Sequence, residues 1–246
     1  TRDIRTVSLT KTQIQEYLHA DTSKKREDIE KEYGLNPRIV NGHYIPNPFY
    51  RLNDLYGFDI HVDTPVDFFH VALIGIFPST VELVNEYLGP SKVHMLDEEI
   101  SKHKAFQQTL LWKYHNNWTG DHWLKFLAIA PFVYTNIIDM TDAKEVALLT
   151  CLLKLCNWIR MLLQPAMRTE DIYSAEKEWY AWHLQILELF PHDSINLKTY
   201  FHTVQHVFDF AKSWGPPILY WSCPYDHRHK TFKRLISESN HKNELV

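Results

Sequence analysis

The sequence predicts a mainly α-helical bundle that ends in one short strand and a basic helix. Three observations lead to this fold class. Glycine is scarce, at 7 of 246 residues, and aromatic residues make up 14% of the chain, a composition that suits helices packed through bulky side chains. Apolar residues recur at helical spacing in most segments. The best strand candidate is one short apolar run, residues 218–221.

The overall composition is that of a globular protein, with 45% hydrophobic and 23% charged residues. The net charge of -4 argues against a surface that coats nucleic acid in general, but it allows a local basic patch. Three cysteines without zinc spacing favour a reducing compartment. We expect no membrane span and no signal peptide, and therefore a nuclear or cytoplasmic protein that is not secreted. Because the chain begins at Thr1 and not at Met, we interpret it as a piece of a longer protein.

The N-terminal part is expected to hold two helices within residues 8–34. Ser8 or Thr10 can cap the first helix, and Gly34 ends the second. The second helix is charged on most faces, which is typical of a solvated or projecting helix. Residues 36–53 are rich in Pro and Asn and are expected to form an extended connection.

The segment 64–88 is predicted to be a buried helix that carries two polar groups. Thr64 is the expected N-cap and Pro65 the first helical residue. Asp67 then falls in the first turn, where the helix dipole favours a negative charge. His70 lies three residues further along, on the same face. The simplest interpretation is a capping Asp beside a hydrogen-bonded core His.

Further helices are expected at residues 91–116, 121–138, 141–163, 168–190 and 195–213. The segment 141–163 is the most apolar and should be the core helix, with Cys151 and Cys156 as buried structural thiols. The segment 168–190 carries an aromatic stripe, for which core packing is a better explanation than a stacking platform.

His202 and His206 lie four residues apart on one expected helix. This spacing suits two imidazoles on one metal ion. Residue 203 is Thr and not Glu, so the pair is not the HExxH signature of metalloproteases. With 15 histidines in the chain, hydrogen-bonded structural histidines are the competing interpretation.

The C-terminal tail places one carboxylate, Asp226, at an expected helix start that follows the predicted strand. A dense group of cations comes after it: Arg228, Lys230, Lys233, Arg234 and Lys242. A carboxylate at such a junction, beside cations that can contact phosphate, is how a two-metal nuclease presents a ligand. The alternative is a first-turn Asp on an exposed basic helix. No glycine-rich nucleotide loop and no G-x-S-x-G nucleophile motif is present.

Four stretches occur in an order and spacing that resemble the C-terminal half of fungal transposon-derived proteins of the CACTA-like, Plavaka-type group. They are NPFYRLNDLYGFDIHVDTPVDFFHVALIGI from Asn47, GDHWLKFLAIAPFV from Gly120, FHTVQHVFDFAKSWGPP from Phe201 and LYWSCPYDHRHKTFKRLISESNHKN from Leu219. The stretches are scattered over residues 47–243, with unmatched sequence between them.

The resemblance implies a ribonuclease H-like fold with a large helical insertion before the last catalytic acid. Such DDE transposase-like proteins cut and join DNA with Mg²⁺ or Mn²⁺ held by three carboxylates. Asp67 and His70 match the family's D-x-x-H signature, and His202, His206 and Gly215 match its H-x-x-x-H…G run. By the same resemblance, Asp226 stands where the family has its last catalytic, metal-binding acid, which is usually Glu.

The resemblance also divides the chain into a helical arm and linker (1–46), an insertion-like helical domain (47–213) and the strand and basic helix of a catalytic domain (214–246). The first two catalytic acids have no match here, so the chain alone is expected to be inactive. The alternative is a catalytically dead helical module that binds DNA or protein. DNA is the expected partner, through Arg228, Lys230, Lys233 and Arg234; a homo-oligomer is allowed, and no membrane contact is expected.

Overall fold

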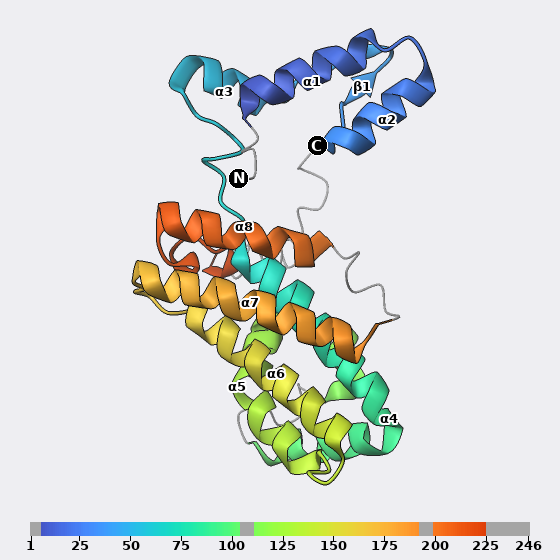
Figure 1. The fold of residues 1–246 in the computed structure, drawn as a ribbon, viewed down its shortest axis with the longest axis vertical. Coiled ribbons are helices and arrows are strands. Elements are labelled where there is room, and N and C mark those ends of the chain that lie inside the picture. Colours follow the sequence, from blue (N-terminus) through green and yellow to red (C-terminus); the bar gives the residue numbers. More distant parts are fainter. Residues whose placement is uncertain (1–5, 104–110, 192–198, 225–246) are drawn as a thin grey trace, which may run out of the picture. The chain divides into compact units, whose positions relative to one another are not determined.

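The computed structural model describes residues 6–103, 111–191 and 199–224, with the side chains of residues 199–201 left aside (Figure 1). Over these residues the protein is mainly helical. The chain divides into two compact units, Thr1–Pro65 and Val66–Val246. Each unit is described by itself.

The first unit consists of short helices and one small hairpin. Its elements are α1 (Val7–His19), α2 (Ser23–Tyr33), β1 (Ile39–Val40), β2 (His43–Tyr44) and α3 (Pro48–Tyr56). The expected cap of α1 was wrong, because Thr6 has extended backbone and its side chain accepts a hydrogen bond from the Leu9 N–H at 3.2 Å. Gly34 ends α2 in the left-handed conformation, as predicted.

Residues 36–53 are not simply extended. β1 and β2 pair in antiparallel fashion around Asn41 and Gly42, which both have positive φ angles, of 50° and 78°. Asn-Gly accepts these angles at low cost, which is why the pair forms a tight hairpin turn. Asn47 then caps α3, and Pro48 is its first residue.

The second unit is a helical bundle, which confirms the predicted fold class at this coarse level. Its elements are η1 (Phe69–Ile76, a π-helix), α4 (Phe77–Lys102), η3 (Trp112–Asn117), α5 (Gly120–Ile137), α6 (Ala143–Leu162), α7 (Thr169–Leu189), α8 (Thr199–Trp214) and η5 (Pro217–Leu219). The π-helix η1 packs against α4, α5 and α8, whereas α6 packs against α5 and α7 (Figure 1). The N-terminal part of the 64–88 segment is therefore central to the bundle.

One part of the bundle core is built from aromatic rings on α6, α7 and α8. Trp158, Trp179, Trp182 and Phe208 are almost fully buried. The Trp158 indole N–H donates to the Ala175 carbonyl at 3.1 Å, and the Trp182 N–H donates to the Cys151 carbonyl at 3.1 Å. These bonds satisfy the polar edges of two buried indoles. The predictions of a core helix and of an aromatic core stripe are confirmed.

Cys151 and Cys156 are free thiols in this core. Burial raises the pKa of each thiol to about 12. At neutral pH both remain protonated, which fits the predicted structural role.

The segment from Phe69 to Lys102 is continuous except for a kink. Gly89 has a φ of 77° and a ψ of 173°, so the predicted end of the 64–88 helix is confirmed, and Pro90 opens the next helical stretch. The predicted helix 91–116 was wrong in extent, because α4 ends at Lys102 and residues 112–117 form the 3₁₀ helix η3. By length and composition alone this segment would suffice to cross a membrane, contrary to our expectation, but 61% of its most apolar window is buried in the bundle.

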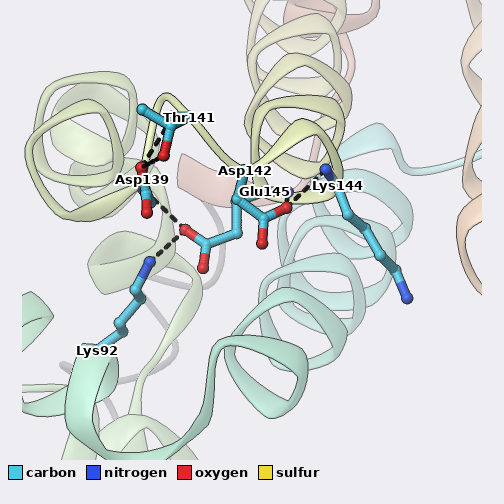
Figure 2. Close-up of polar contacts among 6 residues, drawn as sticks. All are labelled: Lys92, Asp139, Thr141, Asp142, Lys144 and Glu145. Carbon is cyan, nitrogen blue, oxygen red and sulfur yellow. Dashed lines mark hydrogen bonds and ion pairs between the residues drawn. The ribbon is translucent and has the colours of Figure 1, made fainter.

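A polar corner ties the turn between α5 and α6 to α4 (Figure 2). Lys92 forms an ion pair with Glu145, whose carboxylate also accepts a hydrogen bond from the Asp139 backbone N–H at 2.8 Å. Of the two cap candidates that the sequence offers, Thr141 and Asp142, it is Asp142 that caps α6, by accepting from the backbone N–H groups of Lys144 and Glu145. Hydrogen bonds from Thr141 lower the pKa of Asp139 (Figure 2). These contacts give the acidic groups a structural role.

The predicted strand at residues 218–221 was wrong. Pro217–Leu219 form the 3₁₀ helix η5, because Leu219 N–H bonds the Pro216 carbonyl at 3.0 Å and Tyr220 N–H bonds the Pro217 carbonyl at 3.3 Å. A four-residue apolar run after two prolines can fill either a strand or a buried turn. The ribonuclease H-like relation thus stays a prediction.

Candidate functional site

The candidate site lies where the π-helix η1 begins. Asp67, and not Thr64, is the helix cap, since its Oδ1 accepts from the Phe69 N–H at 3.1 Å and its carbonyl accepts from the Val71 N–H at 3.2 Å. The helix therefore starts later than the sequence predicted. The π-helical conformation that follows is rare and occurs frequently at functional sites.

The Asp67 carboxylate also reaches a segment 155 residues away in the sequence. Its Oδ1 accepts a hydrogen bond from the Ser222 backbone N–H at 3.0 Å. The Ser222 Oγ lies 3.1 Å from the His70 Nδ1. We call these three residues, Asp67, His70 and Ser222, the Asp–His–Ser junction. It fixes the chain that follows η5 onto the start of η1.

His70 donates a hydrogen bond from Nδ1 to the Asp67 Oδ2. The histidine side chain is 46% exposed and the aspartate side chain 29% exposed, so the expected core position of His70 was wrong. Desolvation raises the pKa of Asp67, but the hydrogen bonds from His70 and Ser222 outweigh it, and the pKa is lowered overall. The aspartate is thus ionised at neutral pH.

The junction has the residue types of a serine hydrolase triad but not its geometry. In a triad one ring nitrogen of His contacts the carboxylate and the other contacts the Ser hydroxyl. Here Asp67 and Ser222 both meet Nδ1 of His70. The ring therefore does not relay a proton between them, and the arrangement serves to hold chain segments together.

Aromatic packing frames the junction. The Phe69 ring meets the Trp221 ring edge to face, with centroids 5.6 Å apart. A Cβ atom added to Gly120 would lie 2.1 Å from the Phe69 Cζ, so a side chain at this position would clash with the ring. Three of the four stretches that carry the family resemblance, those containing Phe69, Gly120 and Trp221, therefore meet at this place.

The predicted histidine pair lies elsewhere on the bundle, on α8. The Nε2 atoms of His202 and His206 are 3.4 Å apart, and their ring centroids are 5.2 Å apart. Gly215 ends α8 with a φ of 85°, and its N–H bonds the Ala211 carbonyl at 3.0 Å. Among the described residues, no group of three or more His, Cys, Asp or Glu side chains is placed to hold a metal ion.

The tail residues of the sequence prediction, Asp226, Arg228, Lys230, Lys233 and Arg234, lie outside the described residues. Their roles as metal ligand, catalytic acid and DNA contacts stay predictions. The last described residues, Cys223 and Pro224, are helical and follow Ser222 directly. The junction thus holds the chain at the point where the predicted basic helix begins.

Sequence reasoning did not single out Ser222, Phe69, Gly120 or Trp221 as site residues. All four fall inside the stretches that carry the resemblance, and this was the available signal. The chemistry of these residues alone gave no such signal, because a lone Ser and a lone Gly are common at helix ends in any protein.

Comparison of the sequence with protein-family models found no match. Searches of curated proteins and of solved structures found no match either.

Proposed function

We propose that the chain is a fragment of a transposon-derived, DNA transposase-like protein. In this proposal residues 47–213 are the helical insertion, and the basic segment that follows Ser222 is the last helix of a ribonuclease H-like catalytic domain. The first two catalytic acids have no match in the chain, so the fragment alone does not join DNA strands. Its retained activity is DNA binding through the cations of the tail.

The observation that supports this proposal is the Asp–His–Ser junction. The D-x-x-H residues, Asp67 and His70, bond Ser222, which stands four residues before Asp226. Residues that the resemblance groups by sequence are therefore grouped in space, and they hold the segment that leads to the predicted acid. In the intact protein Asp67 and His70 would act as positioning residues for that segment.

Metal ions enter the proposal only through Asp226. In the intact family, Mg²⁺ or Mn²⁺ supplies charge stabilisation for phosphoryl transfer at the three carboxylates. Asp is one methylene shorter than the usual Glu, so its reach toward a shared ion is smaller.

The test is DNA affinity as a function of salt concentration. Each lost phosphate contact should flatten the slope of log K against log salt by about 0.9 for duplex DNA. For the double variant K230A/K233A we expect a slope flatter by about 1.8 and weaker binding at low salt. The matched control is K24A/K25A, which removes two exposed lysines from α2. Equal losses in both variants, or no salt dependence in the original chain, would contradict the proposal.

A second candidate is a catalytically dead helical module, favoured by Asp226 in place of Glu and by the net charge of -4. Titration with Mn²⁺ separates it from the first. A fragment of a working catalytic domain binds Mn²⁺ more weakly after Asp226→Asn. If the D226N variant and the original chain bind Mn²⁺ equally while DNA binding persists, the dead module is the better description.

A further inference from the structure

We propose that His202 and His206 form a two-histidine site for a divalent transition-metal ion, with Zn²⁺ as the reference ion. The site shares no residue with the Asp–His–Ser junction. It does not depend on the transposase proposal.

The distance between the two ligand atoms carries the inference. Zinc binds imidazole nitrogen at about 2.0–2.1 Å and prefers tetrahedral angles. Two nitrogens bound to one zinc ion at that angle are therefore roughly 3.4 Å apart. The Nε2 atoms of His202 and His206 are 3.4 Å apart. One ion can thus bridge them without a shift of the helix backbone.

The packing of α8 holds the two rings in place. Val204, Val207 and Phe208 are fully buried, and Ala211 is 1% exposed, which fixes the rotation of the helix about its axis. His202 is exposed and His206 is partly exposed, so a hydrated ion can reach the pair from solvent. Ligands on a helix anchored in this way lose little conformational entropy on binding.

Metal binding replaces the hydrogen bond between the two rings with two bonds from nitrogen to the metal ion. In the metal-free protein one Nε2–H donates to the Nε2 of the other ring. Metal binding needs the lone pairs of both Nε2 atoms, so the proton moves to Nδ1 of the donor ring as the bridging hydrogen bond is lost. Two neutral imidazoles then bind the ion with no net release of protons. Because each ligand must be a neutral imidazole, protonation of either ring opposes metal binding.

The pair supplies only two ligands from the described residues, because no third His, Cys, Asp or Glu lies in metal-binding position there. Water or an external donor completes the coordination shell. An open coordination position is typical of exchangeable sites and not of closed structural zinc sites. Imidazole ligands suit Zn²⁺, Ni²⁺ and Cu²⁺, whereas Mg²⁺ prefers oxygen ligands.

The test is titration of the whole chain with ZnCl₂ by calorimetry, repeated with Co²⁺ as an absorbing substitute. H202A and H206A should each weaken the strongest site by about tenfold or more, because each removes one of two protein ligands. The matched control is H94A, since His94 is an exposed helical histidine on α4 that pairs with Glu98 across one turn. Circular dichroism confirms that the variants keep their helices.

Retention of the strongest site in the double variant H202A/H206A overturns the proposal. An equal loss in H94A overturns it too, because the binding would then be a diffuse property of a chain with 15 histidines. A site that prefers Mg²⁺ over Zn²⁺ is a third contrary result. Loss in both α8 variants with H94A unchanged supports it.

Discussion

The two units of the chain are held together in different ways. In the second unit large aromatic and aliphatic side chains from many helices pack into one continuous core. In the described part of the first unit, the buried hydrophobic residues are Val7, Ile14, Ala20 and Ile29. The same unit exposes 58% of Leu55 and 78% of Tyr56. Apolar burial thus stabilises the second unit far more than the first.

Polar contacts partly replace a core in the first unit. The Val7 N–H donates to the Asp59 carboxylate at 3.1 Å, and Thr10 Oγ1 lies 2.9 Å from His61 Nε2. Net contributions of single hydrogen bonds are about 0.5–1.5 kcal/mol, less than the burial of one large apolar side chain. Because it buries less apolar surface, the first unit should open locally at a lower free energy than the bundle.

The largest loss of stability is expected when an aromatic ring is removed from the bundle core. Trp158→Ala leaves a large cavity and removes the indole bond to Ala175. We expect the free energy of unfolding to fall by about 3–5 kcal/mol. Urea denaturation followed by circular dichroism measures it. The control is Tyr180→Ala, an exposed aromatic residue 40% accessible on α7, with a change within about 0.5 kcal/mol. Equal effects of the two substitutions would show that the core is not where the bundle's stability resides.

A smaller loss is expected from overpacking at Gly120. Gly120→Ala drives a methyl group into the Phe69 ring and should cost about 1–3 kcal/mol. The same denaturation experiment in a Phe69→Leu background is the control, because the smaller side chain leaves room for the methyl group. If Gly120→Ala costs the same in both backgrounds, the clash is not the cause.

The junction offers a test that depends on pH. Asp67→Ala removes a helix cap, and we expect it to cost about 0.5–2 kcal/mol at neutral pH. Because the pKa of Asp67 is lower in the folded than in the unfolded protein, its contribution is fully present above about pH 3.9 and disappears as the pH falls through the lowered value. Thermal unfolding of both proteins between pH 2 and pH 7 measures this. A stability difference that stays constant down to the lowest pH would contradict the ionised-cap interpretation.

The smallest effect is expected in the first unit. Lys11 and Asp54 form an ion pair at 2.7 Å, with side chains 40% and 61% exposed. Exposed pairs contribute about 0.2–1 kcal/mol, so Lys11→Ala should change the stability of α1 by no more than this. Hydrogen exchange at the α1 amides measures it, and 1 M salt should reduce the difference. A loss above about 2 kcal/mol would mean that this polar contact stabilises the first unit more than exposed ion pairs usually do.

The fold class and the core could be predicted from the sequence because their signals are local. Helical apolar spacing defines α6 and α7, and Asp142 and Gly34 are residues whose own chemistry ends or begins a helix. The strand at residues 218–221 could not be judged in this way. Four apolar residues fit several structures, and contacts with the rest of the chain decide between them.

The junction shows a different limit of sequence reasoning. Asp67 and His70 were predicted to share a face, and the structure brings their side chains together. Thr64 and Asp67 are both good caps, and the contact with Ser222 favours Asp67. A partner 155 residues away leaves no periodic signal in one sequence, so Ser222 could not be found.

The three cysteines differ in exposure, and this difference allows the chain to be labelled selectively next to its C-terminal tail. Cys151 and Cys156 are shielded and remain protonated, whereas Cys223 is half-buried and stands next to Ser222. A thiol-reactive fluorophore should therefore modify Cys223 in preference to the core thiols without any engineered residue. The natural chain thus carries its own attachment point for a reporter, one residue from the contact with Asp67.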